Sequence, residues 1–266
     1  MEYQILNPSD QEYPKRLLER LGESSPEKIF FWGPLDFLKR FTMAVISADS
    51  ISGLALMAAN QLLFTIREYD INIIGGWHSV METEIFRLGL FRKNFTVSLF
   101  TAKGLERESF ESFLETRFYP PLHEFPEREE YFRRAREGRL LMLSISSPGE
   151  ARMKRSNIIF RNWVACALSD VVFVPFAEKR TKTFALARRV LSAKIPIFTT
   201  YHESNDDLHK LGILGFSRKS VGTYLEKLGA RRAQPIGKEL NRIVLHPPTT
   251  DPEKKSPEFI QGKFNF

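Results

Sequence analysis

Residues 158–177 read IIFRNWVACALSDVVFVPFA, and this stretch decides what kind of fold the chain can form. Arg161, Asn162 and Asp170 interrupt the apolar run, and charges at such depths cost too much for an ordinary membrane span. Its first part has helical spacing, whereas 171–176 is a short run of β-branched and aromatic residues. We therefore predict a buried helix followed by a buried strand.

The same alternation extends along the chain in both directions. Strands are predicted for six apolar runs, at 42–47, 71–75, 95–101, 140–145, 171–176 and 195–200. Helical patterns occur at 53–69, 80–90, 108–118, 157–168 and 182–193. Continuously apolar strands are typical of a sheet covered on both faces. Strands that alternate with helices predict a doubly wound α/β fold with a mostly parallel sheet.

Three regions follow from this pattern. Residues 1–41 form a short lead-in, in which Pro14 starts a helix and Gly22 ends it. Residues 42–229 form the α/β domain. Residues 230–266 contain five prolines and little periodicity, which predicts an irregular basic tail.

Cysteine usage and the first residues of the chain bear on the compartment. Cys166 is the single cysteine, so an internal disulfide framework and a multi-cysteine zinc site are excluded. The first 17 residues include acids and lack an apolar core, so they are not a secretory signal. We expect a soluble cytoplasmic protein that does not bind membranes.

Positive charge is concentrated in one segment. Segment 151–194 contains ten Lys and Arg residues and two acids, Asp170 and Glu178, so its net charge is +8. The net charge of the whole chain is +7, so the rest of the chain carries −1. Such a local excess indicates a polyanion site, although a solvated helix face would read the same way. The segment 124–139 has mixed charge, and we expect it to be an exposed helix and loop.

Ligands of this architecture bind beyond the carboxyl ends of the strands, so the turns there hold the candidate residues. After the first core strand, Ser52 can approach a phosphate or simply cap the next helix. After the second, Gly75 and Gly76 allow close backbone approach or a tight turn.

The richest group surrounds the start of the predicted helix 157–168. Cations and aromatic rings alternate there, and the aromatic rings could stack on bases or pack in the core. The candidates are Lys154, Arg155, Phe160, Arg161, Asn162 and Trp163, with Lys179, Arg180 and Lys182 after the strand 171–176.

Motifs for catalysis are missing from the sequence. No G-x-G-x-x-G, G-x-x-x-x-G-K-[ST] or G-x-S-x-G occurs, so we expect no enzyme and no cofactor. The cluster from His202 to His209 has no standard metal spacing, and Asn205 or Asp206 is better explained as a helix N-cap. We therefore predict neither catalytic residues nor a metal site.

An ordered series of motifs resembles the DNA-processing protein family DprA (Smf). The lead-in has Tyr13-Pro14-x-x-Leu17 and Phe30-Phe31-x-Gly33; further landmarks are Ala44-Val45-Ile46-Ser47-Ala48-Asp49-x-x-Ser52, Gly75-Gly76 through Glu82, Arg161-Asn162 and Ala167-Leu168-Ser169-Asp170. The departures from the family pattern are also clear. Asp49 and Trp163 stand where the family has arginines, the segment 179–183 lacks the family's Ser-Gly turn, and no winged helix is expected in the tail.

The resemblance implies a Rossmann-like domain that binds single-stranded DNA, forms a homodimer and assists loading of a RecA-type recombinase in recombination or natural transformation. Ser52, Arg161 and Asn162 carry over as binding positions, and Gly75 with Gly76 as a turn. Two alternatives remain: a degenerate paralogue acting by protein contacts, and a nucleotide-ligand protein like the LOG-type phosphoribohydrolases, whose P-G-G-x-G-T-x-x-E turn is absent here.

Overall fold

The computed structural model describes residues 2–117 and 128–234. The described residues up to Ala233 belong to one compact unit. The predicted irregular tail, 230–266, therefore lies almost wholly outside the described residues.

The described strands form one nine-stranded sheet in the order β1-β2-β6-β5-β4-β3-β7-β8-β9. Their bounds are β1 Gln4–Leu6, β2 Ile29–Trp32, β3 Thr42–Val45, β4 Ile71–Gly75, β5 Phe95–Thr101, β6 Leu140–Ser144, β7 Val171–Val174, β8 Ile197–Thr200 and β9 Leu214–Phe216. Only the pairs β1–β2 and β2–β6 are antiparallel. The predicted doubly wound, mostly parallel sheet is confirmed.

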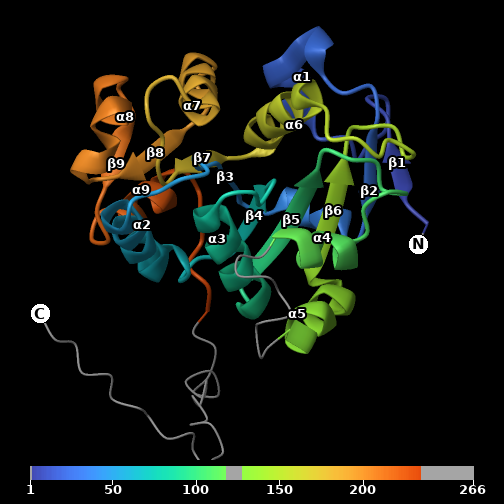
Figure 1. Ribbon diagram of the computed structural model, residues 1–266, viewed down its shortest axis with the longest axis horizontal. Helices are drawn as coiled ribbons and strands as arrows, with labels where there is room; N and C mark the ends of the chain where they lie inside the picture. Colours follow the sequence, from blue (N-terminus) through green and yellow to red (C-terminus); the bar gives the residue numbers. More distant parts are fainter. Residues whose placement is uncertain (1, 118–127, 235–266) are drawn as a thin grey trace, which may run out of the picture. The chain divides into compact units, whose positions relative to one another are not determined.

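Helices cover both faces of this sheet (Figure 1). One face carries α1 Lys15–Leu21, α6 Arg155–Leu168, α7 Lys182–Ser192 and α8 Asp206–Lys210. The other carries α2 Gly53–Ile66, α3 Val80–Phe91, α4 Phe110–Arg117, α5 Arg128–Arg134 and α9 Val221–Lys227. Short helical turns lie at η1 Gly22–Ser24, η2 Leu35–Lys39, η4 Ala135–Arg139 and η5 Glu203–Asn205.

The two layers explain why the strands are continuously apolar. Side chains alternate between the faces of a strand. In β3, Met43 and Val45 belong to the core beneath α2 and α3, whereas Ala44 belongs to the core beneath α6 and α7. The stretch 158–177 folds as predicted, into a helix and a buried strand. None of the helices in the described part of the chain combines the length and hydropathy that a membrane crossing needs.

The lead-in joins this unit at one edge and one face. Pro14 precedes α1, and Gly22 ends it with a φ of 54°, as predicted. β2 pairs with β6, and α1 lies against α6, where Arg16 donates to the Leu168 carbonyl oxygen over 2.8 Å.

The segment 124–139 differs from its prediction. Residues 118–127 lie outside the described residues, but α5 is not an exposed helix: Tyr131 and Phe132 are only 2% and 4% exposed. The Tyr131 ring packs edge-on against Phe91 of α3, with 4.8 Å between centroids. The sequence pattern did not predict this burial, because the two aromatic residues lie within one turn of a helix whose other residues are charged.

Candidate nucleic-acid interface

The strand order reverses at β3, which creates a topological switch point. β3 pairs with β4 on one side and β7 on the other. The chain passes from β3 through α2 to β4, and it reaches β7 only after β6 and α6. Open α/β sheets bind ligands at the carboxyl ends of the strands beside such a point. Three loops meet there, at 46–52, 76–79 and 175–181.

The loop after β3 is buried and hydrogen-bonded near its start, and its later residues are exposed. Ser47 is buried; its N–H donates to the Glu82 carboxylate over 2.9 Å, and its carbonyl oxygen accepts from Thr183 Oγ1 over 3.2 Å. Asp49 and Ser52 are exposed. Ser52 Oγ accepts from the Ala55 N–H over 3.2 Å, so Ser52 is the N-cap of α2, as one of the two sequence interpretations holds.

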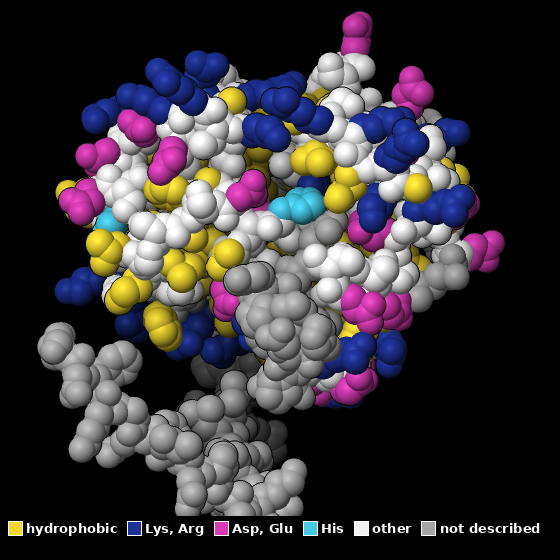
Figure 2. Space-filling model, in the orientation of Figure 1, with side chains coloured by type: hydrophobic (Ala, Val, Ile, Leu, Met, Phe, Trp, Pro, Cys, Tyr) yellow, Lys and Arg dark blue, Asp and Glu magenta, His cyan; other side chains and the backbone are white. Residues whose placement is uncertain are grey.

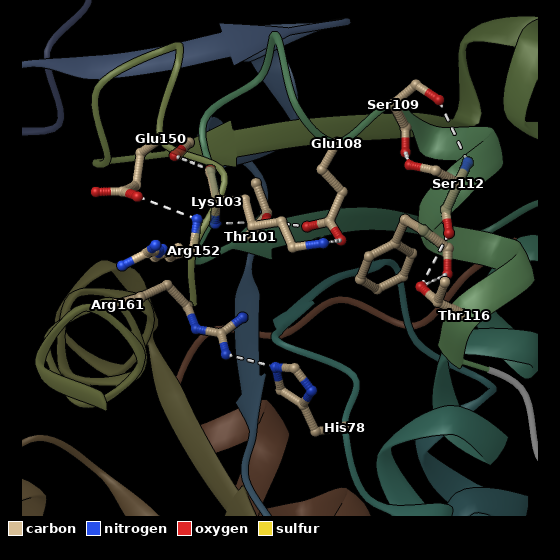
Figure 3. Close-up of polar contacts among 12 residues, drawn as sticks. His78, Thr101, Lys103, Glu108, Ser109, Ser112, Thr116, Glu150, Arg152 and Arg161 are labelled. Carbon is tan, nitrogen blue, oxygen red and sulfur yellow. Dashed lines mark hydrogen bonds and ion pairs between the residues drawn. The ribbon is translucent and has the colours of Figure 1, made fainter. Parts of the chain in front are cut away.

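The loop after β4 is shaped by a buried arginine. Arg161 of α6 is fully buried, and it donates to the Phe100 carbonyl oxygen. Its Nη2 lies 2.8 Å from Nε2 of His78, which is exposed (Figure 3). A side chain on Gly76 would collide with this guanidinium group, while one on Gly75 would lie 3.1 Å from the Val45 carbonyl oxygen. The paired glycines thus permit close approach, but to the protein's own groups.

Glu82, in the first turn of α3, links these two loops. Its carboxylate accepts hydrogen bonds from the N–H groups of Ser47 and His78, each over 2.9 Å. Burial raises the pKa of the Glu82 carboxyl group, and the backbone donors and Arg161 offset only part of the rise. Sequence reasoning did not select Glu82 as a site residue. Its signal was the capping-box spacing from Ser79 to Glu82, because Ser79 Oγ accepts from the Glu82 N–H over 3.1 Å.

The start of α6 carries two of the predicted cations. Lys154 is the N-cap, Arg155 is the first helical residue, and both are exposed. Lys154 Nζ lies 2.6 Å from the Glu150 carboxylate, a bond that lowers the pKa of Glu150. The first turn holds no acidic residue. Cations at this end oppose the helix dipole, so together with the free N–H groups they concentrate positive potential.

The start of α7 repeats this arrangement. Thr181 caps the helix by accepting from the Phe184 N–H over 3.2 Å, and Lys182 follows with no acidic residue in the first turn. Lys179 Nζ lies 3.2 Å from Asp207 of α8. Arg180 has a φ of 68°, so an arginine adopts the left-handed conformation that glycine would take more cheaply in this turn.

The aromatic candidates and Asn162 lie deeper in the protein. Trp163 is 4% exposed, and the Arg189 guanidinium group lies 4.2 Å from its ring centroid. The alternative of core packing fits Trp163, because a ring covered in this way offers no face to a base. Phe160 and Asn162 are half-buried, and Phe160 packs against the core beneath α6. Stacking by Phe160 stays a prediction.

The remaining candidates form an exposed group that we name the basic rim. Its members are Lys154, Arg155, Lys179, Arg180 and Lys182. Figure 2 shows Lys and Arg side chains gathered along the upper part of the molecular face, over α6 and α7. β6 and β7, which lead into these helices, are four strand positions apart, a span of about 19 Å at ordinary strand spacing.

The cluster from His202 to His209 serves local structure. The His202 ring accepts from the Ser204 N–H over 3.1 Å and so caps η5. Asn205 is the N-cap of α8, as predicted, but its side chain makes no capping bond and instead donates to the Pro175 carbonyl oxygen over 2.9 Å. Within the described residues, no three His, Cys, Asp or Glu side chains are grouped to hold a metal ion.

Fold and site together define a doubly wound α/β protein whose carboxyl edge presents cations at two helix starts. The family model described as DNA recombination-mediator protein A matches residues 4–110. The fold resembles DNA processing protein A of Streptococcus pneumoniae, with a TM-score of 0.65 and 17% identity over 85% of this chain and 74% of that chain.

A second solved structure, DNA processing protein A of Helicobacter pylori, covers 85% of this chain and 97% of that chain, with a TM-score of 0.63 and 17% identity. That protein has a unique single-stranded DNA binding mode. None of the curated proteins matches the sequence. The resemblance to the DprA family that the motifs predict is confirmed over residues 4–110, and the two solved structures show the same fold.

Proposed function

We propose that this chain is a divergent DprA-type protein that binds single-stranded DNA through its phosphates on the basic rim. The observation that carries the proposal is the start of α6 and of α7. Both begin with exposed cations, neither has an acid in its first turn, and both lie at the carboxyl edge of the sheet. Helix N-termini and Lys or Arg side chains are the two commonest protein partners of phosphate.

The set of residues we assign to DNA is narrower than the one expected from sequence. Arg161 is buried and bonded within the protein, so it supports the loops and does not reach a phosphate. Trp163 lies in the core. Contacts made mainly by exposed cations give sequence-tolerant binding that weakens with salt.

Fluorescence anisotropy of a labelled single-stranded oligonucleotide, titrated at several salt concentrations, tests this function. Three or four phosphate contacts predict a slope of log K against log salt of roughly −2 to −3. The proposal is contradicted if the folded protein shows no binding at 50 mM salt, or binds with a slope near zero.

The proposal extends to the compartment, the oligomeric state and the cellular role of the protein. We place the protein in the cytoplasm as a homodimer without hydrolytic turnover, where it assists a RecA-type recombinase in recombination or DNA uptake. The support is the resemblance over residues 4–110 and the fold shared with the two DNA processing proteins. Sedimentation at micromolar concentration tests the dimer, and a single species of 30.8 kDa would rule it out. Release of phosphate or base from nucleotides by the pure protein would contradict the absence of turnover.

A paralogue that acts by protein contacts is the second candidate. Its support is an apolar surface on α2, where Leu54 and Met57 are 61% and 62% exposed beside a cleft of about 290 Å³. Figure 2 shows hydrophobic side chains gathered in this part of the molecule. Substituting Leu54 and Met57 by serine separates the two candidates. Under the first proposal the variant binds DNA with unchanged affinity, whereas under the second neither the variant nor the unaltered protein binds DNA.

A further inference from the structure

A buried carboxylate lies where doubly wound proteins usually place the anion of a ligand. The first loop after the central strand offers backbone N–H groups to phosphate in such folds. Here that loop begins at Ile46, directly beyond β3, and the N–H of the next residue, Ser47, donates to Glu82 over 2.9 Å. The protein's own carboxylate therefore uses the donor that a phosphate would need.

The second bond of the carboxylate is also unusual for its place in the helix. In a capping box, the glutamate side chain returns to the N–H of the N-cap residue. Ser79 is the N-cap of α3, and its N–H does stabilise the carboxylate, but Glu82 also accepts from the N–H of His78, one residue earlier. The bond to His78 allows one carboxylate to connect the loops after β3 and β4. Its two donors, Ser47 and His78, are 31 residues apart in the sequence.

Side chains of α6 and α7 also interact with Ser47 and Glu82. Thr183 of α7 donates to the Ser47 carbonyl oxygen over 3.2 Å, so both backbone groups of Ser47 are engaged. Arg161 reaches the same site from α6 and attracts the carboxylate electrostatically. Ser47 Oγ is buried without a hydrogen-bond partner among the described residues.

We propose that Glu82 is the internal anion of the switch point, a positioning residue that joins the loops after β3 and β4 and excludes phosphate from the crevice between them. The exclusion is independent of DNA binding. The corollary, that DNA lies above a closed crevice on the basic rim, rests on the proposed function.

Thermal unfolding with added anions tests the proposal without DNA. In the variant Arg155→Glu, Lys182→Glu, whose basic rim is weakened as a phosphate site, we expect the Tm to respond to inorganic phosphate no more than to sodium chloride of equal ionic strength. Glu82→Ala should lower Tm by about 5–10 °C, because the buried N–H of Ser47 and the partly buried N–H of His78 lose their acceptor. Formate supplies the missing carboxylate, so it should restore part of this loss, with a rise that grows as the logarithm of its concentration.

Two variants keep the test decisive. Glu84→Ala, two residues along α3, removes the same charge from a half-buried site and should show no formate response. Glu82→Gln retains the size of the side chain without its charge and should also show no formate response. Where Glu82→Ala does not fold, a Tm of Glu82→Gln equal to that of the unaltered protein would overturn the role as internal anion.

Saturable binding of phosphate, seen as a line shift in phosphorus NMR, that persists in the variant Arg155→Glu, Lys182→Glu would overturn the exclusion, because this variant weakens the basic rim as a second phosphate site. A Glu82→Ala variant that folds but responds equally to formate and chloride would overturn the role as internal anion. Failure of DNA binding alone would leave both results standing and would count against the proposed function only.

Discussion

Arginines and lysines at the two edges of the sheet have opposite surroundings. At the amino edge, Arg20 donates to the carbonyl oxygens of Ala167 and Ser169 at the end of α6, over 2.8 and 2.6 Å. Arg40 donates to the Asn94 carbonyl oxygen over 2.7 Å. Burial lowers the pKa of both guanidinium groups. At the carboxyl edge, the basic rim is exposed.

Helix direction accounts for the difference. A helix ends in unpaired carbonyl oxygens with partial negative charge, which accept from arginine within the same protein. A helix begins with unpaired N–H groups, which cannot accept from a cation. Arg155, Arg180 and Lys182 of the rim therefore remain available to an external anion, whereas the arginines of the amino edge stabilise the fold. Lys154 and Lys179 of the rim form ion pairs with Glu150 and Asp207. The amino edge also has a cleft of about 570 Å³, but Asp70 and Asp170 line it beside its cations.

Substitution of Arg161 should have the largest effect on stability. Arg161 is buried and donates to a backbone carbonyl oxygen, as the arginines of the amino edge do. Arg161→Ala should lower the free energy of unfolding by about 3–5 kcal/mol, since it leaves buried partners behind. Urea denaturation measures this change. A loss below 1 kcal/mol would mean that Arg161 is not part of the core.

Arg20→Ala should cost about 2–3 kcal/mol of unfolding free energy, because two carbonyl oxygens lose a charged donor. DNA affinity, measured under conditions where the variant is folded, should not change. A weaker affinity would show that the amino edge also contacts DNA and would remove the contrast between the edges.

The double variant Arg155→Glu, Lys182→Glu should show the reverse pattern. Loss of two phosphate contacts lowers affinity about 25-fold in 0.1 M salt and reduces the salt slope by about 1.4, with repulsion adding to the loss. Stability should change by less than about 0.5 kcal/mol, because both side chains are exposed. The matched control is Arg188→Glu, Lys227→Glu, two exposed cations away from the helix starts. Equal losses in both double variants would refute a localised rim.

Removing negative charge near the rim should strengthen binding by a smaller factor. Glu150→Gln releases Lys154 from a 2.6 Å ion pair, and Asp49→Arg places a cation between the two helix starts. One added phosphate contact corresponds to about fivefold in 0.1 M salt. Anisotropy titrations of the single variants measure this gain, and unchanged affinity in both would argue that DNA passes elsewhere.

The smallest expected effect is a pH dependence that comes from Glu82. Its pKa is raised in the folded protein by burial, so the folded state binds more protons than the unfolded state above pH 4.5. The contribution of Glu82 to stability should thus rise as pH falls from the raised pKa toward 4.5. Arg161, His78 and buried Cys166 lie around the carboxylate and are retained in Glu82→Gln, which should lack this component. Identical pH profiles of the two proteins would contradict the raised pKa.

Local sequence patterns were enough for most of the helices and strands. Apolar runs predicted six strands of the sheet, and Pro14 and Gly22 marked the ends of α1. These features depend on residues within one turn or one strand, so a linear pattern contains them. β1 and β9 were missed because three residues are too few to show a period.

The location of the charges was decided only by the tertiary structure. In sequence, Arg155 and Arg161 are equivalent cations of one basic segment, yet Arg155 is exposed and Arg161 is fully buried. The helix turns Arg161 toward β5 and His78, residues 61 and 83 positions away in the chain. The bond from Ser47 to Glu82 likewise exists only because β3 and β4 are neighbours in the sheet. The sequence by itself determined the fold and the positive segment, and the sheet order determined which of its cations face solvent.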